Sequence, residues 1–185
     1  MEQPKTDPRI FRTRKLIMES FIELSGKKDF KDITIKDITT EAMINRATFY
    51  YHFKDKYDLL EKVLSEVLLI NLNYEAYEEH ELNEEAIVSI FTAITNFQKS
   101  LSNRCHSGYE DTIARIIRDQ LEVIFYKMLV KRHPTKEDQV LKCTAVMLSW
   151  GIYGASVEWR KNSQESSEDF IKVVIPSILY GIDFK

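Results

Sequence analysis

The chain has 185 residues, of which 44% are hydrophobic and 30% charged, and its formal net charge is -3. This composition excludes a disordered chain and fits one or two compact domains. Because it has only five glycines and four prolines, it is too poor in turn residues for a loop-rich sandwich, and we expect long helices. Residues 1–62 carry 13 Lys and Arg against 11 Asp and Glu, whereas residues 63–185 carry 13 against 18. The slightly basic first third weakly favours a surface that faces nucleic acid.

The sequence shows no signal for export or membrane insertion. Its start is polar and unlike a signal peptide, and no run approaches the roughly 18 apolar residues of a membrane span. We therefore expect a cytoplasmic protein with no membrane partner. Cys105 and Cys143 have neither the number nor the spacing of a disulfide framework or a zinc site, so we interpret both as buried, reduced thiols. Cys105 with His106 beside it is a poor metal site, and we expect no metal and no cofactor.

The first predicted helix begins at Asp7-Pro8, because aspartate is a good cap and proline suits the first helical position. Ile17 and Phe21 then follow at helical spacing, and the polar residues 26–29 should end the helix.

Two short helices joined by a tight turn come next. Thr34 and Asp37 have the spacing of a capping box, so the second helix is expected to open at Thr34. Asn45 is the next candidate cap, in front of a helix over residues 46–53. Only two or three residues around Met43 separate the two helices, which predicts a helix-turn-helix.

A longer amphipathic helix should follow the interruption at residues 54–56. Asp55 is suited to cap it, and its apolar side extends from Leu59 to Leu72. The acidic stretch at residues 75–85 is the expected boundary between a head and a larger body. We therefore expect a helix-turn-helix domain at 1–55, a connecting long helix at 56–78 and a helical body at 79–185.

The body should contain three or four helices. Apolar residues recur every three to four positions over 87–101 and again over 113–128. A third helix is expected from Thr135 to about Arg160. A last one, capped by Ser166 or Ser167, should reach Tyr180.

From Ile35 to Lys56 the chain reads IKDITTEAMINRATFYYHFKDK, and this segment closely resembles the TetR family of bacterial one-component regulators. The resemblance lies in the threonine before this segment, in Ile38, and in the string over residues 48–53 that reads threonine, aromatic, tyrosine, any residue, histidine, phenylalanine. It covers about residues 10–64, roughly the first third of the chain.

Three positions depart from the family pattern. Thr39 stands where alanine is usual, and Met43 and Asp29 stand where glycine is usual. Because a side chain disfavours the left-handed backbone conformation, Met43 is expected to strain the turn.

The resemblance implies an all-α fold, with an N-terminal three-helix helix-turn-helix DNA-binding domain and a C-terminal helical ligand-binding and dimerisation domain. Short side chains at the start of the third helix suit close approach to the major groove, and Arg46 suits a guanine edge. The phenol, imidazole and ammonium groups that follow suit phosphate oxygens, as does a helix N-terminus at Thr34. The predicted DNA-binding residues are Thr34, Asn45, Arg46, Ala47, Thr48, Tyr50, Tyr51, His52 and Lys56.

A plainer interpretation exists for each of these features. An aromatic string in a helix is more often core than a DNA surface, but its place between a turn and basic residues reverses that preference here, with Phe49 and Phe53 core in either case. The basic residues of the first helix suit a solvated face or phosphate contacts, and both interpretations stay open for Lys5, Arg9, Arg12, Arg14 and Lys15.

The resemblance also implies subunit pairing through the last two helices and an effector pocket in the body. Small residues that allow close helix approach, and apolar residues on more than one face of the last helix, give the expected dimer interface. It comprises Gly151, Gly154, Ala155, Val173, Val174 and Ile178. Aromatic and apolar residues give the expected pocket walls, which are Phe91, Phe97, Phe125, Met147, Trp150 and Tyr153; for any single one of them, plain core is the stronger interpretation.

These features predict a ligand-responsive repressor that binds a palindromic operator in double-stranded DNA as a homodimer and responds to a small apolar or aromatic effector of unknown identity. The alternative is a TetR-fold co-regulator that acts through protein contact without binding DNA. An enzyme is not expected, and no catalytic residue is assigned, because the sequence has no glycine-rich phosphate loop, nucleophile elbow or paired metal-ligand motif.

Overall fold

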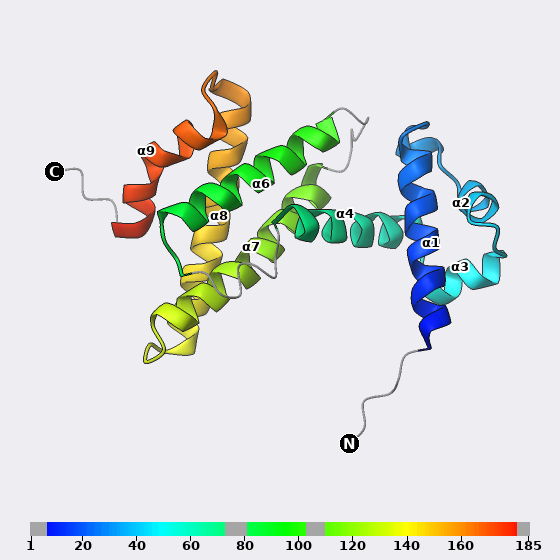
Figure 1. Cartoon of the computed structure of the whole chain (residues 1–185), viewed down its shortest axis with the longest axis horizontal. Helices are drawn as coiled ribbons and strands as arrows, with labels where there is room; N and C mark the ends of the chain where they lie inside the picture. Colours follow the sequence, from blue (N-terminus) through cyan, green and yellow to red (C-terminus); the bar gives the residue numbers. More distant parts are fainter. Residues whose placement is uncertain (1–6, 73–80, 103–109, 181–185) are drawn as a thin grey trace. The chain divides into compact units, whose positions relative to one another are not determined.

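The computed structural model describes residues 7–72, 81–102 and 110–180, and these residues form helices and turns without a strand (Figure 1). The all-α prediction is therefore confirmed. The elements in chain order are α1 (Pro8–Ser25), the short 3₁₀ helix η1 (Phe30–Asp32), α2 (Ile35–Glu41), α3 (Arg46–His52), α4 (Lys56–Leu72), α6 (Glu84–Ser102), α7 (Glu110–Arg132), α8 (Asp138–Asn162) and α9 (Ser167–Tyr180).

The chain divides into two compact units. The first extends to Val63, and the second contains residues 64–101 and the helices α7 to α9. The division falls inside α4, so this helix contributes its first half to one unit and its second half to the other.

The first unit is held by an apolar core between α1, η1 and the two short helices. α1 begins as expected, because the Asp7 carboxylate accepts a hydrogen bond from the Arg9 amide at 2.9 Å and Pro8 occupies the first turn. Its inner face buries Ile17 and Phe21. The Phe21 ring meets Phe30 edge-on at 5.8 Å between centroids, which is the favoured geometry of an aromatic pair.

The turn between α2 and α3 is a Schellman motif with a methionine in the glycine position. The Ile44 amide donates to the Thr39 carbonyl at 3.0 Å, and the Met43 amide donates to Thr40 at 3.2 Å. Met43 itself has a backbone φ of 49°, and it is the one non-glycine residue with positive φ among those described. The left-handed conformation that this motif needs suits glycine. The expected strain at Met43 is therefore present.

The second unit is built on α7 and α8, which pack along each other. Its core consists of large apolar side chains, among them Phe91, Phe97 and Phe125, all completely buried. The Arg132 guanidinium donates to the Leu82 carbonyl at 2.7 Å and so fastens the end of α7 to the turn before α6. α9 begins as expected, since the Ser166 hydroxyl accepts from the Asp169 amide at 3.1 Å.

α8 leaves an apolar stripe in solvent. Val140, Met147 and Trp150 are exposed at intervals of three or seven residues, with Met147 74% accessible, and the same side carries Cys143. The prediction that Cys143 is a buried thiol is therefore wrong. By length and composition α8 alone among the described helices is able to span a membrane, but an exposed stripe on one side of a helix suits a protein partner equally well.

Replacing Met43 by glycine should stabilise the first unit. The side chain is 90% exposed, so its removal costs no packing, and glycine relieves the left-handed strain, for a net gain of about 1 kcal/mol in the free energy of unfolding. Urea denaturation measures the change. The control is Met43→Ala, which removes the same exposed side chain but keeps the Cβ atom; equal stability of the glycine and alanine variants would contradict the assigned strain.

Candidate nucleic-acid interface

α3 presents a two-sided surface that fits a recognition helix. Phe49 on its inner side is completely buried, and Phe53, which caps its end, is also in the core. On its outer side Arg46 and Ala47 are exposed at the N-terminal end, and Tyr51, 68% accessible, is exposed further along. A small residue next to a long donor at the start of the helix allows its backbone to approach base edges.

The caps of α2 and α3 already use several of the predicted donors. The Thr34 hydroxyl and amide both donate to the Asp37 carboxylate, at 2.7 and 2.8 Å, and the Thr34 hydroxyl accepts from the Asp37 amide. These hydrogen bonds from Thr34 lower the pKa of Asp37 to about 2. The predicted capping box is therefore confirmed. In this geometry the Thr34 hydroxyl and amide are engaged in the cap, and its contact with DNA stays a prediction.

Asn45 and Thr48 form a similar cap on α3. The Asn45 side-chain oxygen accepts from the Thr48 amide at 2.8 Å and from the Thr48 hydroxyl at 3.0 Å. The Thr48 proton is thus engaged, whereas the exposed Asn45 keeps its side-chain NH₂ group for another partner.

The structure places Lys56 in a different role from the one predicted. Its ammonium group donates to three backbone carbonyls of the segment before α2: Phe30 at 3.1 Å, Lys31 at 3.1 Å and Ile33 at 2.9 Å. It also lies 4.7 Å from the centre of the Phe30 ring. Because an ammonium group has three N–H donors, none is left for a phosphate. In this structure Lys56 is therefore a structural anchor, and its contact with DNA stays an untested prediction.

Lys54 is the basic residue of this loop that stays available. Its side chain is exposed, and its ammonium group has no partner among the described residues. Its backbone amide donates to the Asp58 carboxylate at 3.0 Å, which fixes the loop in front of α4. Sequence reasoning missed Lys54 because two lysines at the same end of α3 differ only in what folds around them.

His52 lies at the end of α3, half-buried and close to α1. Burial, followed by the nearby positive charge of Arg14, lowers the pKa of His52 below its ordinary value. The Arg14 guanidinium stacks over the Phe53 ring at 4.8 Å. The lowered pKa favours the uncharged imidazole, which is able to form a hydrogen bond to a phosphate.

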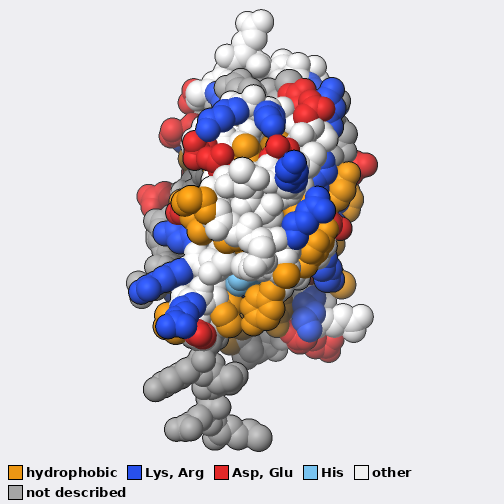
Figure 2. Space-filling view, turned by 90° about the vertical axis from the view of Figure 1, so that its right-hand side faces the viewer, with side chains coloured by type: hydrophobic (Ala, Val, Ile, Leu, Met, Phe, Trp, Pro, Cys, Tyr) orange, Lys and Arg blue, Asp and Glu red, His pale blue; other side chains and the backbone are white. Residues whose placement is uncertain are grey.

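Figure 2 shows the distribution of charge on one face of the molecule. Lys and Arg side chains border a pale central area of uncharged atoms, and acidic side chains gather mainly toward one end. Basic groups beside an uncharged centre suit a duplex, whose phosphates flank the base edges of a groove.

The six predicted pocket residues do not share one environment. Phe91, Phe97 and Phe125 are core, whereas Met147 and Trp150 lie on the exposed stripe of α8. Trp150 is covered on one side by the Arg118 guanidinium, 4.0 Å from the ring centre, and the same group lies 5.4 Å from the half-buried Tyr153 ring. The six side chains therefore differ in exposure, and a common effector pocket among them stays a prediction.

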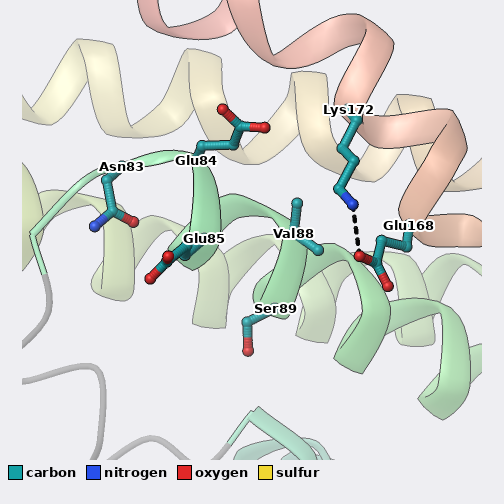
Figure 3. Close-up of a pocket in the computed structure, with 7 residues that line it drawn as sticks. All are labelled: Asn83, Glu84, Glu85, Val88, Ser89, Glu168 and Lys172. Carbon is teal, nitrogen blue, oxygen red and sulfur yellow. Dashed lines mark hydrogen bonds and ion pairs between the residues drawn. The ribbon is translucent and has the colours of Figure 1, made fainter.

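An open groove of about 640 Å³ lies between the start of α6 and α9 (Figure 3). Six of its seven lining residues are polar or charged, with three carboxylates and one ion pair in which Lys172 meets Glu168 at 2.6 Å. The lining residues are Asn83, Glu84, Glu85, Val88, Ser89, Glu168 and Lys172. None of them belongs to the predicted pocket, and an acidic surface groove does not suit the predicted apolar effector.

The predicted interface residues lie on the solvent side of the last two helices. Gly151, Gly154 and Val173, which is 78% accessible, are exposed, and Ala155, Val174 and Ile178 are partly exposed. An added Cβ at Gly151 or Gly154 would meet no atom within 4 Å, so nothing within the described part of the chain covers these positions.

The predictions on Cys105, His106 and residues 75–80 lie outside the described residues.

A short helix with an exposed polar face, preceded by a tight turn from another short helix, defines the class of helix-turn-helix proteins. Residues 17–63 match the model of the family described as bacterial regulatory proteins, tetR family. A curated relative, the uncharacterized HTH-type transcriptional regulator YxbF of Bacillus subtilis (strain 168), is 39% identical over 64 residues, which are 34% of this chain and 17% of that protein. The curated match thus covers only a sixth or so of the relative's length.

Two solved structures resemble the chain over most of its length. The TetR family repressor AlkX from Dietzia sp. strain DQ12-45-1b has a TM-score of 0.57 at 13% identity, covering 89% of this chain and 94% of that one. The dihydroxyacetone kinase operon activator DhaS has a TM-score of 0.58 at 16% identity, covering 90% and 96%. The match over residues 17–63 confirms the resemblance of this segment to the TetR family, and the likeness to the two solved structures shows that the chain shares their fold.

Replacing Lys56 by methionine should destabilise the first unit. The three carbonyls would be left without a charged donor, and the free energy of unfolding should fall by about 2 kcal/mol, since a hydrogen bond to a charged group contributes about 1.5–3 kcal/mol when a site is well buried. The matched control is Lys54→Met, two residues away, whose effect should stay within about 0.5 kcal/mol. Thermal or urea denaturation compares the two, and equal losses of stability would contradict the anchoring role.

Proposed function

We propose that this protein is a transcription regulator that binds a palindromic operator in double-stranded DNA as a homodimer, through α3. The observation that supports this most directly is the outer face of α3, where Arg46, Ala47 and Tyr51 are exposed while Phe49 anchors the helix from below. The family match over residues 17–63 covers this whole segment.

The side chains divide into two roles. Arg46, exposed at the start of α3, is the donor for base edges, most naturally the O6 and N7 acceptors of guanine. Tyr50, Tyr51 and the exposed Lys54 are placed after it, where phenol and ammonium donors hold phosphates and set the register of the helix in the groove. Asn45 keeps an NH₂ group for the same purpose, and the uncharged His52 adds a hydrogen bond at the end of α3.

The exposed stripes of α8 and α9 support the homodimer. Met147 and Val173 are large apolar residues left in solvent, and Gly151 and Gly154 allow a second helix to approach closely. Pairing through these helices would bury them, and a two-fold pair repeats each contact. Two copies of α3 would then read half-sites about 34–36 Å apart or a multiple of it, which makes the operator palindromic.

The division of labour follows the chain. Residues 1–55 would bind DNA, residues 56–78 connect, and residues 79–185 pair the subunits and receive a small apolar or aromatic effector in the cytoplasm. Repression is the proposed direction, in line with the solved repressor AlkX, while the activator DhaS has the same fold. A reporter gene behind the selected operator decides the direction by its expression with and without the protein.

The DNA-binding proposal is tested by selecting duplexes from a random-sequence library with the wild-type protein. We expect an inverted repeat, and we expect Arg46→Ala to reduce the binding free energy by about 1–3 kcal/mol at one base position. Lys54→Gln should reduce the slope of log affinity against log salt by about 0.9 for each phosphate that Lys54 no longer neutralises. Lys56→Gln, in contrast, should leave that slope unchanged under conditions in which the variant remains folded.

Two results would count against the proposal. One is the absence of any enriched sequence at low salt. The other is undiminished binding by both the Arg46 and the Lys54 variants. Failure to bind DNA together with stable retention of a second protein would instead support the alternative, a co-regulator that acts through protein contact.

The homodimer is tested by Met147→Asp. A carboxylate in the centre of the apolar stripe would be desolvated without a partner, so the variant should sediment as a single 21.8 kDa chain while the wild type sediments at twice that mass. The matched control is Val123→Asp, an exposed valine of α7 outside the stripe, which should remain dimeric. A monomeric wild type would refute the pairing.

A further inference from the structure

The described core of the second unit contains one polar side chain whose hydrogen bonding is incomplete. Gln98, on α6, is only 5% accessible. Its side-chain oxygen Oε1 is the one buried side-chain nitrogen or oxygen without a hydrogen-bond partner among the described residues. A buried polar atom that makes no hydrogen bond costs free energy, and folded proteins contain few of them. The oxygen therefore indicates a partner from outside the described chain.

The neighbouring Ser156 determines which end of the Gln98 amide is left over. Ser156, on α8, is completely buried, and its hydroxyl donates to the Tyr153 carbonyl of its own helix at 2.7 Å. Because a serine hydroxyl has a single proton, its oxygen can then only accept, and Gln98 Nε2 donates to it at 3.1 Å. The amide is thus held with Nε2 toward Ser156, and Oε1 is the atom that remains available.

The surroundings of this amide are apolar. Residues three or four positions away share its face of α6, and Ile94 and Leu101 at these positions are buried. Ile152, four positions before Ser156 on α8, is also buried. α6 crosses α8 in Figure 1, and the hydrogen bond between Gln98 and Ser156 shows that the two helices are in contact. In an apolar environment a hydrogen bond is electrostatically stronger than in water.

The other buried hydroxyls of these two helices do not supply the missing donor. Thr95 on α6 donates to the Thr92 carbonyl at 3.0 Å, and Ser149 on α8 donates to the Val146 carbonyl at 2.8 Å. Each proton is thus engaged within its own helix, like that of Ser156. The donor for the amide oxygen therefore comes from a molecule that binds in this core.

A small molecule matches the amide oxygen better than water does. A buried water typically makes about three hydrogen bonds to polar groups that have no other partner, whereas the described core offers one such atom. A molecule with an apolar body and a single donor needs only this one hydrogen bond, and its body suits the apolar surroundings.

The charge of such a molecule is restricted as well. The buried polar side chains among the described residues are serines, threonines and one glutamine, and none of them is charged. An ammonium or carboxylate group buried without an opposite charge is strongly disfavoured. A carboxylate also has no proton to donate. The group that meets the amide oxygen is therefore a neutral O–H or N–H.

We infer that Gln98 is the hydrogen-bond acceptor of a small-molecule site in the second unit, and that the ligand is an otherwise apolar molecule with one neutral O–H or N–H donor, such as an alcohol, a phenol or an amide. Ser156 is a positioning residue, because it holds the Gln98 amide in the accepting orientation. This inference rests on the proposed function and narrows its small apolar or aromatic effector to one chemical class. Pure hydrocarbons and charged molecules are excluded.

The test uses the full chain and two pairs of isomers that differ in the donor. One pair is n-octanol and heptyl methyl ether, and the other is para-butylphenol and para-propylanisole; each ether has the same atoms as its isomer but no O–H group. Isothermal titration calorimetry without DNA measures the affinities. The variants are Gln98→Met, which removes the acceptor at similar volume, and Ser156→Ala, which releases the amide. The matched control is Gln139→Met, at an exposed glutamine of α8.

The wild type and the control should bind the alcohol and the phenol about five- to fiftyfold more tightly than the corresponding ethers. In Gln98→Met this preference should vanish, because the donor then has no acceptor. In Ser156→Ala it should fall, because the amide is no longer held. The side-chain NH₂ signal of Gln98 in the NMR spectrum of isotope-labelled protein, identified by its absence from Gln98→Met, should shift more with the phenol than with its ether.

Three results would overturn the inference: equal affinities of the two isomers for the wild type, a donor preference that survives in Gln98→Met, or binding of none of the four compounds. Gln98 would then pair with a buried water and have a structural role only. Circular dichroism of each variant confirms that the helices are intact.

The proposed function fails or stands separately, because the selection of duplexes uses none of these compounds. A protein that enriches an inverted repeat but shows no donor preference keeps the proposed function and loses this inference. A protein that enriches no duplex loses the proposed function, whatever the four compounds do.

Discussion

The Lys56 ammonium group holds together the part of the first unit that carries α2 and α3. It sits at the first residue of α4 and donates to three carbonyls in the segment that connects α1 with α2. Because the third of these, Ile33, directly precedes the Thr34 cap, the same contact places the start of α2 relative to the beginning of α4. Because the turn and α3 come directly after α2 in the chain, this one charged side chain also helps to position the elements that carry the candidate interface.

Hydrogen bonds within the caps decide which polar side chains remain for DNA. The cap of α2 engages the hydroxyl and the amide of Thr34, and the cap of α3 engages the Thr48 hydroxyl. What stays outward is a narrower set led by Arg46, Tyr51 and Lys54. The caps hold α3 rigidly, while its outer face stays exposed. A recognition helix needs both, because its side chains select a base only when the helix is held in a defined position.

The two units leave different surfaces to solvent. In the first unit the exposed groups include cations that have no partner among the described residues, together with aromatic rings, and both suit a polyanion. In the second unit α8 and α9 expose apolar residues at helical spacing, among them Met147 and Val173, and these suit another helix. A left-handed methionine in the turn adds a local cost that glycine would avoid. The departure from the family pattern at Met43 is thus visible in the backbone itself.

Much of this protein was determined locally by the sequence. Apolar spacing predicted the helices, and the caps at Thr34 and Asn45 predicted where α2 and α3 begin, because caps and periodicity act over a few residues. Tertiary structure alone decided that Lys56 is an anchor while the Lys54 ammonium group has no partner among the described residues, that Cys143 is exposed, and that Met147 lies outside the core that buries Phe91. Those outcomes depend on which distant backbone or helix comes to lie beside a side chain, and spacing along the chain carries no information about that.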